Sequence, residues 1–199
     1  MHHPTIILAS ASRRRGALLA SAGIVVEAVS SRIPEHFIQG ESAQDHVRRL
    51  AEAKARAVAE LHDGRFFIGA DTVVVCGDEV MGKPHDRRDA ERMLRKLSGG
   101  PHEVITGYAV YDAMEDRVRV GAATTRVYFK ALEPLEIAAY VSTGCPLDKA
   151  GAYGIQGRAA YMVARIEGSY TNVVGLPLCE TVDTLVQMGA VSYASGHDG

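Results

Sequence analysis

Apolar and polar positions along the chain predict strands and helices that alternate. Residues 66–75 form an apolar run rich in β-branched and aromatic side chains, which is typical of a buried strand in an α/β sheet. Gly77 and Asp78 then predict a turn, after which a short second strand leads to Gly82, Lys83 and Pro84. The pattern therefore predicts a hairpin around which the rest of the chain is organised.

Further segments carry the signals of strands and helices. Strand-like runs cover residues 5–9, 24–31, 102–111, 118–129 and 161–166. The runs 102–111 and 118–129 are joined by a polar turn, which predicts an antiparallel pair. Helix starts are predicted at Ser12, Ser42, Asp86 and Pro134, and a last helix through residues 178–186. No linker or repeat divides the sequence, so we expect a single domain over residues 1–199.

The helix predicted after Ser42 has a charge on its apolar stripe. Ser42 with Asp45 has the spacing of a capping box. Lys54 lies four residues from two members of the stripe, and therefore faces the same side. A lysine there either extends its ammonium group to solvent or meets an anion, and the sequence leaves both open. The stripe consists of Val47, Leu50, Ala51, Val58 and Leu61.

Composition limits the possible partners. A net charge of −2 gives no support for nucleic acid or a membrane surface as a partner. No apolar segment approaches the roughly 20 residues that cross a bilayer. Three cysteines, Cys76, Cys145 and Cys179, are widely spaced and odd in number, so we expect free thiols in a reducing compartment and a cytoplasmic protein.

Asp71 interrupts the central apolar run. A carboxylate in a buried strand must be paired, hydrogen-bonded or bound to a cation, because burying it bare costs several kcal/mol. Gly69 leaves room for a backbone or a ligand nearby, and Lys83 brings a cation back after the hairpin. Both a structural acid that caps a loop and a functional acid fit this pattern.

Three arginines in the first turn of the helix after Ser12 oppose the helix dipole. Either they form a solvated basic edge, or an anion binds there together with Ser10 and Ser12. In a second polar segment, glycines recur at every third position, at Gly151, Gly154 and Gly157. Such glycines let a backbone approach a ligand closely, and a flexible connection would not require the tyrosine and glutamine between them.

The polar residues without an evident structural role combine two carboxylates with several cations. This set suits a polyanionic substrate with a divalent cation, because Mg²⁺ is commonly held by one or two carboxylates and by substrate phosphates. Walker and GxGxxG motifs are absent from the sequence, which disfavours kinase, P-loop and dinucleotide-binding functions. The residues are Ser10, Ser12, Arg14, Glu35, Lys54, Asp71, Lys83, Lys149 and Gln156.

Five motifs in order resemble the Maf family of nucleoside triphosphate pyrophosphatases, which is linked to septum formation. They are LASASRRRGALL, GADTVVVCGDEVMGKP, ML(x)KLSG with His102, DKAGAYGIQG and GSYTNVVGLPLCET. The resemblance extends from about Ile6 to Met188. Its DKAGAYGIQG motif is similar to the branch that acts on dTTP and UTP, rather than the branch that acts on 7-methyl-GTP.

The resemblance implies an α/β fold with a mixed twisted sheet, flanking helices and two lobes around a central cleft, as in Maf and ITPase proteins. It implies hydrolysis of dTTP and UTP to the monophosphate and pyrophosphate, with Mg²⁺ or Mn²⁺, in a homodimer. Asp71 matches the proton acceptor and, with Glu35, a metal site. Lys54 and Lys83 match active-site charges. Substrate-binding positions match Ser10, Ser12, Arg14, Thr72, Lys149 and Gln156.

Three residues depart from the family pattern. Arg13 replaces a usual proline, Pro34 replaces an aspartate before Glu35, and Cys145 replaces a glutamate. The second change removes one possible metal ligand or base. An alternative function, a nucleotide-sensing regulator of cell division that binds triphosphates without cleaving them, therefore stays open.

Overall fold

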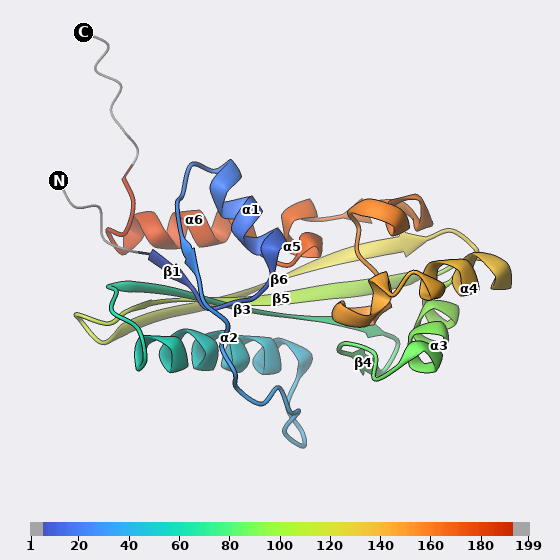
Figure 1. Ribbon diagram of the computed structural model, residues 1–199, viewed down its shortest axis with the longest axis horizontal. Coiled ribbons are helices and arrows are strands. Elements are labelled where there is room, and N and C mark those ends of the chain that lie inside the picture. Colours follow the sequence, from blue (N-terminus) through green and yellow to red (C-terminus); the bar gives the residue numbers. More distant parts are fainter. Residues whose placement is uncertain (1–5, 193–199) are drawn as a thin grey trace, which may run out of the picture.

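The computed structural model describes residues 6–192, which form a mixed α/β fold (Figure 1). Within this range the strands are β1 (Ile6–Leu8), β2 (Glu27–Ala28), β3 (Phe66–Cys76), β4 (Glu79–Met81), β5 (Pro101–Asp112), β6 (Arg117–Phe129) and β7 (Val163–Glu167). The helices are α1 (Arg13–Ser21), α2 (Ala43–Ala59), α3 (Arg87–Leu97), α4 (Pro134–Ser142), α5 (Tyr170–Val174) and α6 (Leu178–Gln187). Short 3₁₀ helices cover Cys145–Asp148, Ala150–Ala152 and Gly157–Met162. In the described range, none of the helices has the length and apolar character of a membrane span.

The strands of the described residues form one sheet in the order β2-β1-β3-β5-β6-β7, with β4 paired to β3. β1 runs parallel to β2 and β3, whereas β3, β5, β6 and β7 pair antiparallel. This mixed sheet with flanking helices confirms the predicted fold class. It also confirms the predicted hairpins β3–β4 and β5–β6.

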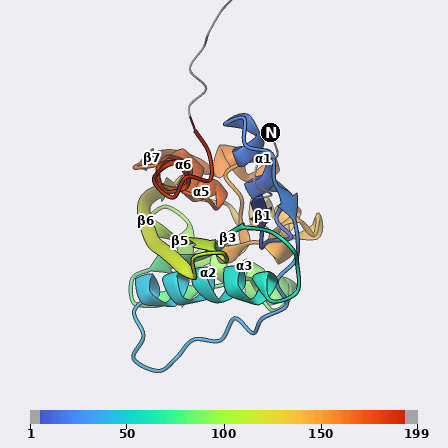
Figure 2. The same cartoon turned by 90° about the vertical axis from the view of Figure 1, so that its left-hand side faces the viewer.

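Helices cover both faces of the sheet. Figure 2 shows α2 on one face and α1, α5 and α6 on the other. α2 approaches β3 and β5 very closely: a Cβ atom on Gly69 would lie 1.9 Å from the Ala51 oxygen, and one on Gly107 would lie 2.2 Å from the Val47 oxygen. Only glycine permits this contact, which brings Lys54 over the part of β3 that carries Asp71.

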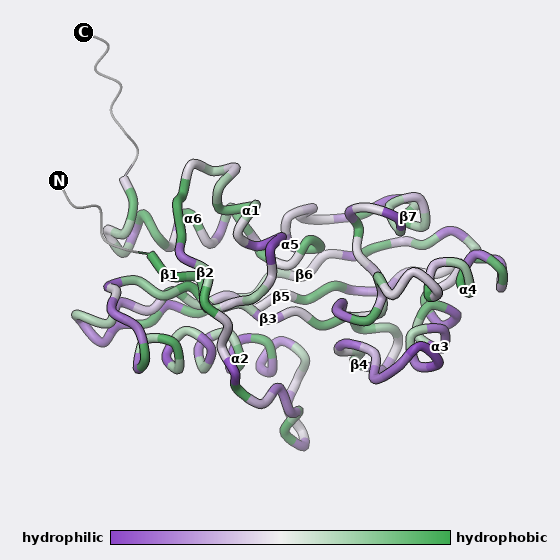
Figure 3. Tube along the Cα trace, in the orientation of Figure 1, coloured by the Kyte–Doolittle hydropathy of each residue, from purple (hydrophilic) through white to green (hydrophobic). Residues whose placement is uncertain are grey.

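The buried apolar side chains fall into separate clusters. One cluster joins the ends of β3, β5 and β6 to α3 and α4, and another joins β1 and the start of β3 to α1 and α6. Figure 3 shows β1 as hydrophobic and α3 as largely hydrophilic. Because α3 buries Ala90, Met93, Leu94 and Leu97, its apolar residues form the narrow stripe that the sequence predicts after Asp86.

Two sequence predictions were wrong in detail. The strand expected over residues 24–31 is reduced to Glu27–Ala28, because this segment forms the edge of the sheet, where Val25 is 89% exposed. Leu61, expected on the stripe of α2, is 80% exposed, because the helix ends at Ala59 before reaching it. The sequence also predicts a frayed tail over residues 191–199, of which residues 193–199 lie outside the described range.

Candidate active site

A cleft of about 790 Å³ opens between the N-terminal end of α1, the middle of β3 and the 3₁₀ segments. Every residue that the sequence places in the site lines this cleft. They are Ser10, Ser12, Arg14, Glu35, Lys54, Asp71, Thr72, Lys83, Lys149 and Gln156. Segments far apart in the sequence therefore bring their polar side chains to one place.

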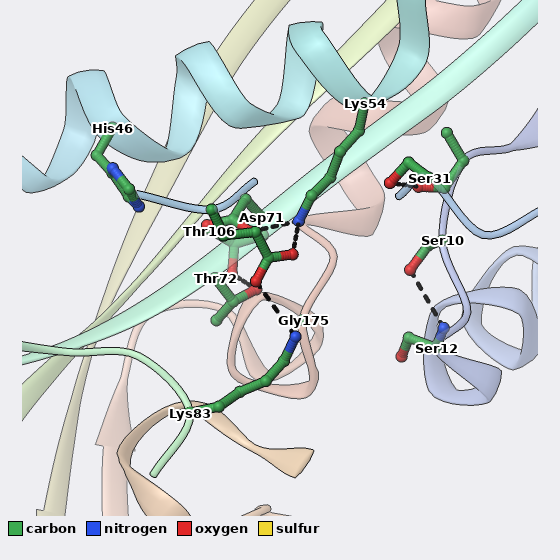
Figure 4. A network of polar contacts seen from close by, with 12 residues as sticks. Ser10, Ser12, Ser31, His46, Lys54, Asp71, Thr72, Lys83, Thr106 and Gly175 are labelled. Carbon is green, nitrogen blue, oxygen red and sulfur yellow. Dashed lines mark hydrogen bonds and ion pairs between the residues drawn. The ribbon is translucent and has the colours of Figure 1, made fainter. Parts of the chain in front are cut away.

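The ammonium group of Lys54 joins two carboxylates of the cleft, those of Asp71 and Glu35. Its Nζ lies 2.6 Å from Asp71 Oδ1 and 2.7 Å from Glu35 Oε1, and only 7% of its side chain is exposed. Lys83 Nζ lies 3.3 Å from the other oxygen of Glu35. Figure 4 shows Lys54 extending from α2 to Asp71, while Lys83 points into the same space from the opposite side. Of the two outcomes that the sequence left open for Lys54, the structure shows the meeting with anions.

The two lysines hold Glu35 in its charged form. Burial raises the pKa of the Glu35 carboxyl, but the hydrogen bonds and charges of Lys54 and Lys83 outweigh burial and lower that pKa below its usual range. The departure at Pro34 does not prevent this contact, because Glu35 next to it still reaches both ammonium groups. Glu35 thus presents a carboxylate, not an acid, at neutral pH.

Arg15 is a cleft residue that the sequence reasoning did not single out. Its guanidinium group donates to the Gly175 carbonyl at 2.6 Å, to Ser10 Oγ at 3.0 Å and to Thr72 Oγ1 at 3.1 Å. Burial lowers the pKa of this group, while the charge of Asp71 raises it. Arg15 therefore links three chain segments that line the cleft by hydrogen bonds. Arg15 shares a helix face with Leu19, four residues later, but Arg14 stands in the same relation to Leu18, so the spacing in the sequence does not distinguish the two arginines.

The remaining polar residues line the same cleft. Arg14 lies 3.8 Å from Asp148, and Lys149 Nζ donates to the Cys145 carbonyl at 2.6 Å. The backbone N–H of Ser12 donates to Ser10 Oγ at 3.2 Å, and the Ser12 side chain makes no cap bond to α1. Gln156 is exposed to the cleft.

Asp71 and Glu35 are carboxylates of the cleft that lie close enough together to share one cation. No cluster of three or more histidine, cysteine, aspartate or glutamate side chains that could hold a metal occurs in residues 6–192. Asp71 and Glu35 nevertheless converge on one cationic group, the ammonium of Lys54. Two carboxylates with room for substrate oxygens fit the ligand preference of Mg²⁺.

The fold and the cleft together define an α/β protein whose polar site is built for a polyanion, with cations around a carboxylate pair. The chain belongs to the Maf family: the model described as "Maf-like protein" matches residues 5–188.

Curated relatives extend over nearly the whole chain. It is 64% identical over 186 residues to a protein of Geotalea uraniireducens named dTTP/UTP pyrophosphatase, covering 94% of this chain and 96% of that protein. It is 61% identical over 191 residues to a protein of Geobacter sulfurreducens with the same name, covering 96% and 100%. Among solved structures, the Staphylococcus aureus Ham1 protein aligns with a TM-score of 0.44 and 15% identity, over 80% of this chain and 79% of that one.

Proposed function

We propose that this protein is a nucleoside triphosphate pyrophosphatase that hydrolyses dTTP and UTP to the monophosphate and pyrophosphate. The observation that carries the proposal is the buried Lys54 ammonium, held between Asp71 and Glu35 on the cleft floor. The relatives named dTTP/UTP pyrophosphatase, which share about 60% of the sequence, support the substrate assignment.

Asp71 is the proposed proton acceptor. Lys54 occupies its Oδ1 atom, so Oδ2 is available to take a proton from the attacking water. The nearby cations Lys54, Lys83 and Arg14 then balance the negative charge that develops on the phosphate oxygens. The proton moves from water to the carboxylate, the oxygen of water bonds to the α or the β phosphorus, and the anhydride bond between these two phosphates breaks, so that pyrophosphate or the monophosphate leaves.

A divalent cation, Mg²⁺ or Mn²⁺, would be held by Asp71 and Glu35 together with the triphosphate. When bound, it supplies Lewis-acid stabilisation of the phosphate charge. Lys54, which contacts both carboxylates, would lie beside such an ion and present its ammonium group to the phosphates.

The two ends of the substrate meet different side chains of the cleft. Ser10, Ser12 and Lys149 provide hydroxyl groups and a charge for the phosphates. Gln156 offers an amide with paired donors and acceptors, which suits the edge of a pyrimidine. Thr72 and Arg14 complete the proposed specificity positions.

A panel of triphosphates tests the proposal. Purified protein is assayed for pyrophosphate release from dTTP, UTP, dCTP, dATP and dGTP, each with Mg²⁺, with Mn²⁺ and with EDTA. We expect release from dTTP and UTP with either metal and none with EDTA. Saturable binding of dTTP without pyrophosphate would instead identify the nucleotide sensor, and preference for a purine would refute the base assignment.

The homodimer and the cytoplasmic location stay predictions that accompany this function. Sedimentation equilibrium at micromolar protein measures the first: one species at about twice the chain mass of 21.3 kDa supports a dimer, and one at the chain mass refutes it.

A further inference from the structure

A buried histidine and a buried tyrosine meet beside the charged site. His102 lies on β5 and is 2% exposed, and Tyr153 follows the 3₁₀ turn Ala150–Ala152 and is 5% exposed. His102 Nε2 lies 2.7 Å from the Tyr153 hydroxyl. This hydrogen bond joins the central sheet to the cleft segment that carries Lys149 and Gln156.

Packing restrains both rings. Phe129, on β6, lies edge-on to His102 at 4.9 Å and to Tyr153 at 4.7 Å between ring centroids. Such edge-to-face contacts favour one ring orientation over others. Within the described residues, His102 Nδ1 has no hydrogen-bond partner. The bond to Tyr153 is therefore the hydrogen bond that satisfies the imidazole, and losing it would leave both ring nitrogens without a partner among the described residues.

The turn before Tyr153 is strained. Gly151 has φ of +65° and Ala152 has φ of +61°, and Ala152 is fully buried. A left-handed alanine persists only where its surroundings hold it in place. Within the turn, the Gly151 N–H donates to the Gly82 carbonyl at 3.0 Å. Immediately after the turn, the hydroxyl group of Tyr153 makes a second hydrogen bond that holds the turn in place, to His102.

Both attachments lead to cleft residues. Gly82 immediately precedes Lys83, so its bond to Gly151 ties the turn to a charge of the site. Gly154 follows Tyr153, and a Cβ atom there would lie 3.0 Å from the Lys149 stem. A shift of the turn therefore displaces Lys149 and Gln156 relative to the phosphate-binding floor.

We propose that His102 and Tyr153 are positioning residues, which fix this segment as the cleft wall that recognises the nucleobase. The inference rests on the proposed function, because base recognition is read as discrimination among triphosphates. Without the hydroxyl bond, the strained turn relaxes and Gln156 loses its fixed place. Binding of the correct base weakens, while the Asp71–Lys54 pair keeps its geometry.

The decisive variant is Tyr153→Phe, with Tyr128→Phe as its matched control. Tyr128 also loses one hydroxyl bond, to Glu167, but lies outside the cleft. We expect hydrogen exchange of the Gly151 amide about tenfold faster in Tyr153→Phe. We also expect the ratio of kcat/KM for dTTP over dCTP to fall about tenfold, chiefly through KM for dTTP. Tyr128→Phe keeps wild-type values of both.

Variants at His102 test the same bond from the other side. His102→Gln retains an amide group that can reach the Tyr153 hydroxyl, whereas His102→Leu does not. We expect the Gly151 exchange rate and the ratio of kcat/KM for dTTP over dCTP to be closer to wild type in His102→Gln than in His102→Leu. Equal losses in the two folded variants contradict the role of the hydrogen bond. If His102→Leu does not fold, as its melting curve reports, Tyr153→Phe alone decides.

The outcomes separate this inference from the proposed function. A folded Tyr153→Phe protein with unchanged exchange and unchanged discrimination overturns the inference. Faster exchange with unchanged discrimination also overturns it, because the pair is then merely structural. If the wild-type protein releases no pyrophosphate from any triphosphate, the proposed function fails. In that case the positioning role is tested by hydrogen exchange of the Gly151 amide and by calorimetric binding of dTTP and dCTP. Faster exchange and a smaller preference for dTTP in Tyr153→Phe than in the wild type support the role, and unchanged values overturn it.

Discussion

At the residue scale, the Lys54 ammonium group determines the charge state of the site. Because the group is almost fully buried, leaving it without an anion would cost several kcal/mol. Asp71 and Glu35 each place a carboxylate oxygen against this ammonium group. Each carboxylate therefore contributes to the stability of the fold as well as to the proposed chemistry. A useful variant changes the chemistry and leaves the stability unchanged, or the reverse.

Asp71→Asn removes the proton acceptor and keeps the shape of the side chain. The amide oxygen still accepts a hydrogen bond from Lys54, and Glu35 still balances its charge, so we expect a folded protein that binds dTTP. Turnover falls at least about 100-fold, the usual effect of removing a general base. Steady-state pyrophosphate release measures it, and Asp116→Asn on the exposed β5–β6 turn is the control. Near-normal turnover would refute the assignment.

Lys54→Met changes the titration of Glu35. Lys54 is the main group that lowers the pKa of Glu35, so its removal leaves burial to raise that pKa. Carboxyl carbon NMR measures the shift directly. Lys83→Met is the matched comparison and gives a smaller rise, because the Lys83 side chain is 57% exposed and lies farther from Glu35. Equal shifts in the two variants would contradict this ranking.

How far residue-level prediction succeeds depends on local signals. Asp71 was identified because a carboxylate conflicts with the apolar run around it, and Lys54 because it lies on an apolar stripe. Arg15 was missed because three adjacent arginines look alike in sequence. Its partner Gly175 lies 160 residues away, and no local pattern encodes that contact.

At the element scale, α2 is placed by the two glycines beneath it. Gly69 on β3 and Gly107 on β5 let the backbone of α2 lie directly on the sheet. The capping box and the apolar stripe predict the helix, and the predicted hydrogen bond from Asp45 N–H to Ser42 is present. The depth at which α2 lies could not be predicted, because it depends on strands that pair far apart in the sequence.

Gly69→Ala tests this placement. The added methyl group collides with the Ala51 carbonyl, so we expect the free energy of unfolding to fall by at least about 2 kcal/mol. The displaced helix also carries Lys54 away from Asp71, which lowers pyrophosphate release. Gly100→Ala is the control, since nothing lies within 4 Å of its Cβ position. Urea unfolding measures both, and equal stabilities of the two variants would show that α2 is not held this way.

At the scale of the whole molecule, the cleft is assembled from segments that meet only in the fold. The strand pairs and most helices follow from periodicity, turn residues and caps, whereas β2 is shorter than predicted because an edge strand lacks a neighbour on one side. The contact between His102 and Tyr153 spans 51 residues. Such contacts decide the geometry of the site, and hydrophobic patterning does not contain them.

The stability of the whole molecule responds to the protonation of His102. Burial lowers the pKa of this imidazole from 6.5 to about 4, so the unfolded chain binds a proton between these values and the folded chain does not. The free energy of unfolding therefore falls as the pH falls through this window. This single group contributes a loss of about 2 kcal/mol between pH 7 and pH 5.

Urea unfolding of wild type and His102→Gln at pH 7, 6 and 5 isolates this effect, because the other titrating groups are shared. We expect the wild type to lose about 2 kcal/mol more than the variant over this range. Parallel pH dependences would mean that His102 titrates normally in the folded protein.

The ion pairs of the cleft floor have a consequence for how a ligand enters. Asp71 and Glu35 are already neutralised by Lys54 and Lys83, so an isolated metal ion or an isolated triphosphate gains little from the field there. A triphosphate that arrives with its divalent cation would offer phosphate oxygens to Lys54 and Lys83 and a cation to Asp71 and Glu35. We therefore expect the cleft to bind the complex of metal ion and triphosphate more tightly than it binds either the metal ion or the triphosphate alone.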